Sequence, residues 1–185
     1  RFAVIGSAYF CPACGHNSVT QTFSDSLRKI KAKKDGIDVV RKALIESIGK
    51  DEAELTCRSL RETCISDGIV AFQKYCEGMY EDFGKIPFNA FQRLEQGSQL
   101  WIIAVQKGYN DWISDEELKK LNILYQKRHL LSHNEGIVDS QYINKSGDTA
   151  YKEGQRIVII DKDIDSLVSS LEKLSNGIKS VCSNI

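Results

Sequence analysis

The sequence has few residues that interrupt helices and no long apolar segment. Only two of its 185 residues are proline, Pro12 and Pro87. This scarcity leaves room for long helices, because proline breaks the helical hydrogen-bonding pattern. No apolar run approaches the roughly 20 residues that a membrane-spanning helix needs. The composition therefore gives no reason to expect a membrane protein, and the length fits one medium-sized domain with its own hydrophobic core.

The sequence also lacks an excess of either charge. It contains 25 basic and 25 acidic side chains, so the formal net charge is zero. A protein that coats nucleic acid without sequence preference usually carries a basic excess. Contact with nucleic acid must therefore come from a local patch, and an RNA-cleaving enzyme needs only a small phosphate pocket. The basic stretch from Lys29 to Lys34 is typical of a solvated helix face.

Six cysteines are present, and no secretory signal segment is visible. A disulfide scaffold is therefore not indicated, and a cytoplasmic location is favoured. Three of the cysteines, Cys57, Cys64 and Cys76, fall on the apolar stripes of expected helices. We expect their thiols to be reduced and buried, because free cysteine behaves as a small apolar residue.

Two further cysteines, Cys11 and Cys14, form a Cys-x-x-Cys pair followed by a glycine. This pattern is typical of one half of a zinc ribbon, in which two thiolates face one cation. A structural zinc takes four ligands, so we expect the missing ligands to precede Arg1, with His16 as a weaker candidate for a third. The alternative is a tight turn that carries two free thiols.

The spacing of apolar residues predicts an all-α fold, an antiparallel helical bundle. The helices are expected at residues 27–48, 51–80, 90–106, 114–133 and 161–182. Ser24 or Asp25 is the expected N-cap of the first, and Gly68 is a candidate break in the second. Residues 156–160 predict a small β element before the last helix. Residues 1–23, with β-prone stretches at 2–6 and 18–23, predict a partial zinc-ribbon segment, and residues 24–185 the helical domain.

The motif with chemical content lies at the end of the fourth expected helix and spans residues 128–134. It places His129 and His133 four residues apart, on the same helix face. The acidic residue that follows the first histidine of zinc peptidases is replaced by Leu130. The pattern therefore favours metal-free RNA cleavage, in which histidine transfers protons near neutral pH and Arg128 binds the phosphate. The ribose 2′-hydroxyl then serves as the nucleophile.

The segment from Arg128 to His133 resembles the Arg-polar-x-x-x-His motif of HEPN domains (higher eukaryotes and prokaryotes nucleotide-binding). The continuation from Asn134 to Tyr142 resembles a bacterial subgroup of that family. The resemblance implies a helical bundle, a homodimer with two motifs at the two-fold axis, and catalysis without a cofactor. It also implies that Arg128 and His133 are catalytic and that His129 orients the site. Ser132, like Asn134, is a candidate substrate-binding residue.

The sequence therefore predicts a HEPN-type endoribonuclease that cleaves RNA through attack of the 2′-hydroxyl. The resemblance implies a role in bacterial defence or stress response, because such nucleases occur in toxin–antitoxin, abortive-infection and CRISPR-linked systems. An antitoxin is then the expected protein partner. Other HEPN domains have lost activity, so the alternative is a noncatalytic scaffold that mediates protein assembly. Tyr142 and Asp139 are expected to hold the segment after the motif, and Trp101 and Trp112 to lie in the core or at an interface.

Overall fold

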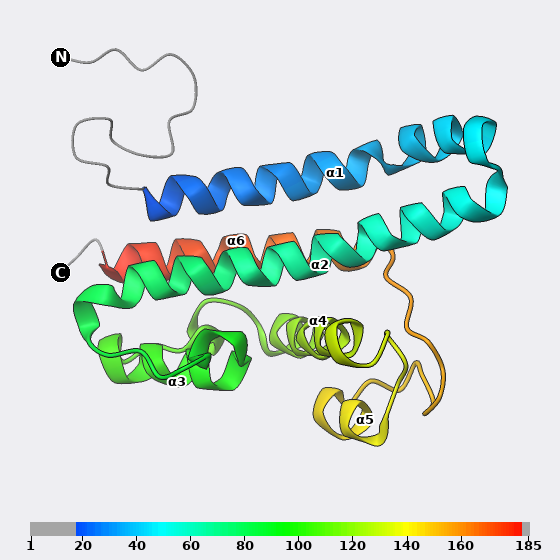
Figure 1. Ribbon diagram of the computed structural model, residues 1–185. Coiled ribbons are helices and arrows are strands. Elements are labelled where there is room, and N and C mark those ends of the chain that lie inside the picture. The colour runs from blue at the N-terminus through cyan, green and yellow to red at the C-terminus, as the bar shows by residue number, and fades with distance from the viewer. Residues whose placement is uncertain (1–17, 183–185) are drawn as a thin grey trace, which may run out of the picture.

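The computed structural model describes residues 18–182, which form a helical bundle (Figure 1). The α-helices are α1 (Val19–Ile48), α2 (Lys50–Tyr80), α3 (Leu94–Val105), α4 (Asp115–His133), α5 (Ser140–Ser146) and α6 (Asp161–Cys182), and the 3₁₀ helices are η1 (Glu81–Phe83), η2 (Ala90–Gln92) and η3 (Tyr109–Asp111). The expected all-α class is thus confirmed. Within residues 18–182, no helix combines the length and the apolar character that crossing a membrane requires.

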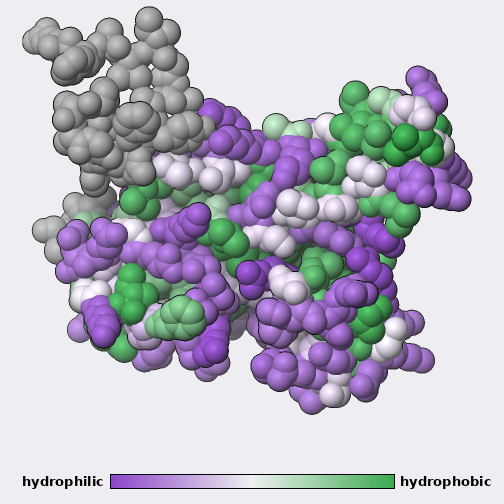
Figure 2. Space-filling model, viewed as in Figure 1, coloured by the Kyte–Doolittle hydropathy of each residue, from purple (hydrophilic) through white to green (hydrophobic). Residues whose placement is uncertain are grey.

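Helices α1 and α2 form a long antiparallel hairpin, and α6 lies along α2 (Figure 1). The hairpin turns at Gly49, whose φ of 89° lies in the region that favours glycine. One end of the hairpin extends past the start of α6. Apolar side chains gather at that end (Figure 2), where Val39, Ile48 and Leu55 are 71%, 50% and 47% exposed.

Helix α1 begins earlier than the sequence indicated. Residues 18–23 were expected as a strand, but Ser18 is the N-cap and its hydroxyl accepts a hydrogen bond from the Gln21 amide. The helical conformation lets Phe23 pack on α2, where its ring centroid lies 4.7 Å from that of Tyr75. The prediction of a strand was therefore wrong, as was that of an N-cap at residue 24 or 25. The expected domain boundary after residue 23 falls within α1.

Two other expectations require correction. The third helix was predicted from residue 90, but η2 ends at Gln92 and α3 begins only at Leu94. The β element predicted at residues 156–160 is reduced to one antiparallel bridge between Ile137 and Arg156, and the described part of the chain contains no named strand. This bridge holds the residues that precede α6 against the segment that follows α4. Within the described residues, no second bridge extends it into a strand.

The structure describes the three cysteines that were expected to be buried, but not the two that were expected to bind zinc. Cys57, Cys64 and Cys76 are free thiols and fully buried, as expected. Cys11 and Cys14, the predicted zinc ligands, lie outside the described residues. The expected core includes the fully buried Trp101, and Trp112 packs partly buried against the same core.

Candidate active site on helix α4

Local sequence fixes both ends of α4. Ser114 and Glu117 form a reciprocal capping box at its start, in which each side chain bonds the backbone amide of the other. At its end, the amides of Asn134 and Gly136 both donate to the carbonyl oxygen of Leu130. Gly136 has a φ of 77°, which suits glycine at such a helix terminus. The last turn, which carries the histidines, is therefore held in place.

One face of α4 lines a groove of about 710 Å³, here called the α4 groove. Asn122, Tyr125, Gln126, His129 and His133 supply this face, at the spacing that places side chains on one side of a helix. Arg128 also lines the groove. The other walls come from the segment around η2 and from α5: Asn89, Gln92, Arg93, Leu94, Glu95, Gln141 and Lys145.

The two histidines lie next to each other in this groove. Their ring centroids are 4.7 Å apart, and both side chains are exposed. Partial desolvation of the ring lowers the pKa of His129, the positive charges of His133, Lys145 and Arg128 lower it further, and the charge of Asp139 raises it. His129 is therefore held as a neutral imidazole at neutral pH, with one nitrogen able to accept a proton.

The arginines of the groove differ from the others in the described part of the chain. Five arginines there have a carboxylate oxygen within 4 Å: Arg28, Arg41, Arg58, Arg61 and Arg156. Arg93 and Arg128 have no such partner within residues 18–182, and both line the α4 groove. The Nε atom of Arg128 is buried without a hydrogen-bond acceptor. Unpaired guanidinium groups are suited to bind an anion such as a phosphate.

Ser132 and Asn134 are not part of the groove lining. Ser132 is exposed. The side-chain amide of Asn134 donates to the carbonyl oxygen of Ile137 at 2.7 Å, so it stabilises the turn after α4. The structure thus brings together Arg128, His129 and His133 and leaves the other two candidates apart from them.

The segment after the motif is structural, as expected. Asp139 is the N-cap of α5 and accepts a hydrogen bond from the Tyr142 amide at 2.7 Å. The buried Tyr142 donates its hydroxyl to Asp148 at 2.6 Å. These contacts fix α5 and therefore place Lys145 at the groove, where its backbone carbonyl also accepts from Asn122.

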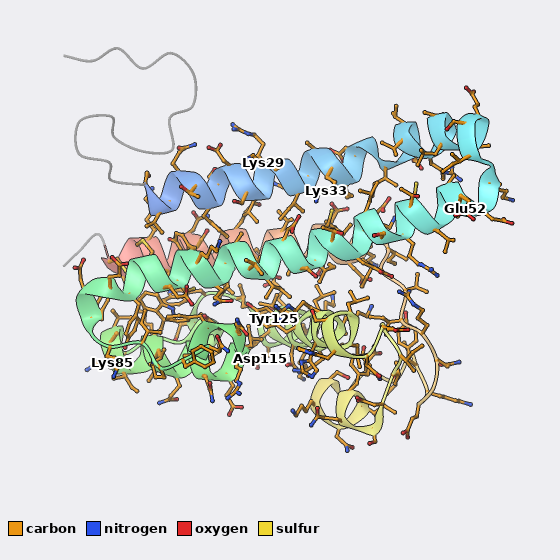
Figure 3. The ribbon with its side chains drawn as sticks, in the orientation of Figure 1. Lys29, Lys33, Glu52, Lys85, Asp115 and Tyr125 are labelled. Atoms are coloured by element: carbon orange, nitrogen blue, oxygen red, sulfur yellow. The ribbon has the colours of Figure 1, made fainter. Side chains whose placement is uncertain are left out.

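The sequence analysis did not identify several residues of the groove. Tyr125, which Figure 3 marks on α4, is 6% exposed, and its hydroxyl has no hydrogen-bond partner in the described structure. Helical spacing back from His129 is a signal that identifies this residue and Asn122. Arg93 and Lys145 come from elements distant in sequence, and no local pattern connects them to the motif.

Among the residues that the structure describes, no group of three or more His, Cys, Asp or Glu side chains is arranged to hold a metal ion.

Comparison of the chain with protein-family models, curated proteins and solved structures finds no match in any of the three.

Proposed function

We propose that this protein is a metal-independent endoribonuclease of the HEPN type. The observation that carries the proposal is the grouping of an unpaired Arg128 with His129 and His133 in one open groove. Arginine and histidine are the side chains that metal-free RNA cleavage uses, for phosphate binding and for proton transfer. The resemblance of residues 128–142 to HEPN domains supports the same activity.

In the proposed reaction, a neutral histidine removes the proton from the ribose 2′-hydroxyl. The 2′-oxygen forms a bond to phosphorus, and the bond from phosphorus to the 5′-oxygen breaks. The leaving oxygen takes a proton from a protonated histidine, and the products are a 2′,3′-cyclic phosphate and a 5′-hydroxyl. His133 transfers a proton, His129 orients the site, and Arg128 stabilises the negative charge that develops on the phosphate.

The proposal includes a homodimer. Arg128 lies roughly 140° from His133 around the helix, five positions at about 100° per residue. A second copy facing the groove would supply its own arginine and histidines to one shared pocket. The exposure of His129 and His133 leaves this face of α4 free for such a partner. A role in bacterial defence, with an antitoxin as protein partner, rests on the resemblance alone.

The test is RNA cleavage by the purified protein in the presence of EDTA. We expect wild-type activity to persist, and His133→Ala to lower the rate by about 10²- to 10⁴-fold, the usual contribution of a proton-transferring group. Ser132→Ala is the matched control, because Ser132 is adjacent and exposed but does not line the groove. Arg128→Lys should restore only part of what Arg128→Ala loses, since lysine lacks the forked donor geometry.

Two outcomes would contradict the proposal. Cleavage that persists in His133→Ala would assign the activity to another site or to a contaminant. Absence of cleavage on all RNAs tested would favour a noncatalytic HEPN scaffold that mediates protein assembly. The exposed apolar residues at the end of the α1–α2 hairpin, among them Val39 and Ile48, favour that second candidate.

A further inference from the structure

An exposed aromatic residue adjoins the α4 groove in sequence. Phe88 is 92% exposed and is the one aromatic among the large exposed apolar residues of the described chain. It is not itself part of the groove lining, but it directly precedes Asn89, which is. Exposing a large aromatic surface to water is unfavourable.

The backbone holds Phe88 in this exposed position. The Ala90 amide donates to the Pro87 carbonyl oxygen at 3.1 Å, which closes a β-turn with Phe88 as its second residue. Asn89, the third residue, has a φ of 56° and a ψ of 22°, near the left-handed conformation that a type II turn requires there. Phe88 is thus presented by a hydrogen-bonded turn with a proline at its start.

Carboxamide side chains line the groove next to this turn. Asn89, Gln92, Gln126 and Gln141 all face it, and none of these four side chains has a hydrogen-bond partner within residues 18–182. A carboxamide offers a donor and an acceptor side by side, the arrangement that matches the edge of a nucleobase. The unpaired Arg93 lines the same wall and can reach a phosphate.

We propose that Phe88, Asn89 and Gln92 form a nucleobase-binding subsite for single-stranded RNA beside the catalytic residues. An unpaired base stacks on the Phe88 ring, its edge meets the two carboxamides, and its phosphate lies toward Arg93. The strand must be single, because the bases of an RNA duplex are stacked on each other and their major-groove edges are out of reach of side chains. This inference rests on the proposed function, since it names the form of RNA that the groove accepts.

The experiment measures binding and is independent of cleavage. The probe is a short single-stranded RNA with fluorine at every 2′ position, which removes the nucleophile, and with one 2-aminopurine base. Fluorescence anisotropy gives the affinity, and 2-aminopurine emission reports stacking. We expect Phe88→Ala to weaken binding by about 5- to 150-fold, the contribution of one base–aromatic stack, and to abolish the change in emission.

Two variants and one competitor make the test specific. Phe88→Trp should retain binding, because it keeps an aromatic face. Ile103→Ala is the matched control, since Ile103 is 69% exposed on α3 but, unlike Phe88, is not adjacent in sequence to a residue that lines the groove. A duplex that contains the same strand should compete poorly.

The outcomes separate this proposal from the proposed function. Equal binding by wild type and Phe88→Ala, equal competition by the duplex, or no binding of the probe would each overturn the subsite. If RNA cleavage is then still lost in His133→Ala, the nuclease stands without it. Phe88-dependent binding without any cleavage keeps the subsite and removes the nuclease. A changed oligomeric state of Phe88→Ala with unchanged RNA binding would make Phe88 a protein contact and also overturn the subsite.

Discussion

At the scale of single residues, His129 depends on its neighbours for its protonation state. Partial desolvation of the ring is the first cause of its lowered pKa, followed by the positive charges of His133, Lys145 and Arg128. A histidine with a lowered pKa is neutral over a wider pH range, because it loses its proton at a lower pH than an ordinary imidazole.

Removing one of these charges gives a direct test. Lys145→Ala takes away a positive charge that disfavours protonation, so we expect the pKa of His129 to rise toward its ordinary value of 6.5. Titration of the His129 ring by NMR in both proteins measures this shift.

Lys120→Ala is the control for this titration, because Lys120 is on α4, the same helix as His129, but is not among the causes of the lowered His129 pKa. A His129 pKa that falls in Lys145→Ala, or moves equally in both variants, would contradict the electrostatic account. It would indicate that removal of the lysine acts by changing the packing of the groove instead.

The sequence identified the candidate residues on α4 more completely than the other walls of the groove. Arg128, His129 and His133 stand within one helical turn and a half, so residue type and spacing are enough to group them. Arg93, between η2 and α3, and Lys145, on α5, approach the same groove. Nothing local relates those positions to α4, because they meet only through tertiary packing. Asn134 lies inside the motif, but its side chain stabilises the turn after α4 and does not line the groove.

At the scale of helices and turns, the expected helix starts were right in one case and wrong in another. The start expected at residue 114 is correct, and a capping box of Ser114 and Glu117 fixes it, whereas the N-cap expected at residue 24 or 25 lies inside α1. The β-branched Val19, Thr20 and Thr22 suggested a strand, and the structure has a helix there. Strand propensity depends strongly on context, and here burial of Phe23 against α2 decides the conformation.

Gly68 illustrates the same point and leads to a prediction. It was a candidate break, but α2 continues through it, and a Cβ atom at this position would lie 2.8 Å from Cδ2 of the fully buried Leu167 on α6. At Gly36, in α1, a Cβ atom would have no neighbouring atom within 4 Å. The two helical glycines are thus a matched pair, one at a close approach of helices and one in open space.

Gly36→Ala should increase the free energy of unfolding by about 0.5–1 kcal/mol, because alanine loses less backbone entropy in a helix than glycine does. Gly68→Ala gains the same amount but overpacks the contact with Leu167, which costs about 1–3 kcal/mol, so we expect net destabilisation. Urea denaturation of both variants gives the two values. Equal stabilisation at both positions would mean that α6 does not approach α2 as described.

At the scale of the whole molecule, cations are distributed unequally. Ion pairs connect the hairpin to α6, among them Lys31 with Glu172, Lys34 with Asp165 and Arg61 with Asp161. Such exposed pairs each contribute little to stability, about 0–1 kcal/mol. Within residues 18–182, however, the two arginines that have no carboxylate partner both line one groove.

That region is the α4 groove. Arg93, Arg128 and Lys145 line it without a carboxylate within 4 Å in the described part of the chain, and Glu95 is the one acidic residue of its lining. A single strand bound there would contact about as many phosphates as there are free cations. Binding of nucleic acid by a neutral protein is then a local property of this groove.

Salt dependence measures that number of contacts. For single strands, the logarithm of the binding constant falls with the logarithm of salt concentration at about 0.7 per neutralised phosphate, so three cations predict a slope of about −2. Arg93→Gln should make the slope shallower by about 0.7, whereas Arg41→Gln, which removes an arginine already paired with Glu54, should leave it unchanged. Anisotropy titrations of the 2′-fluoro probe over a range of salt concentrations give both slopes. A slope that responds equally to the two variants would place the strand outside the groove, because only a strand within it distinguishes a free arginine from a paired one.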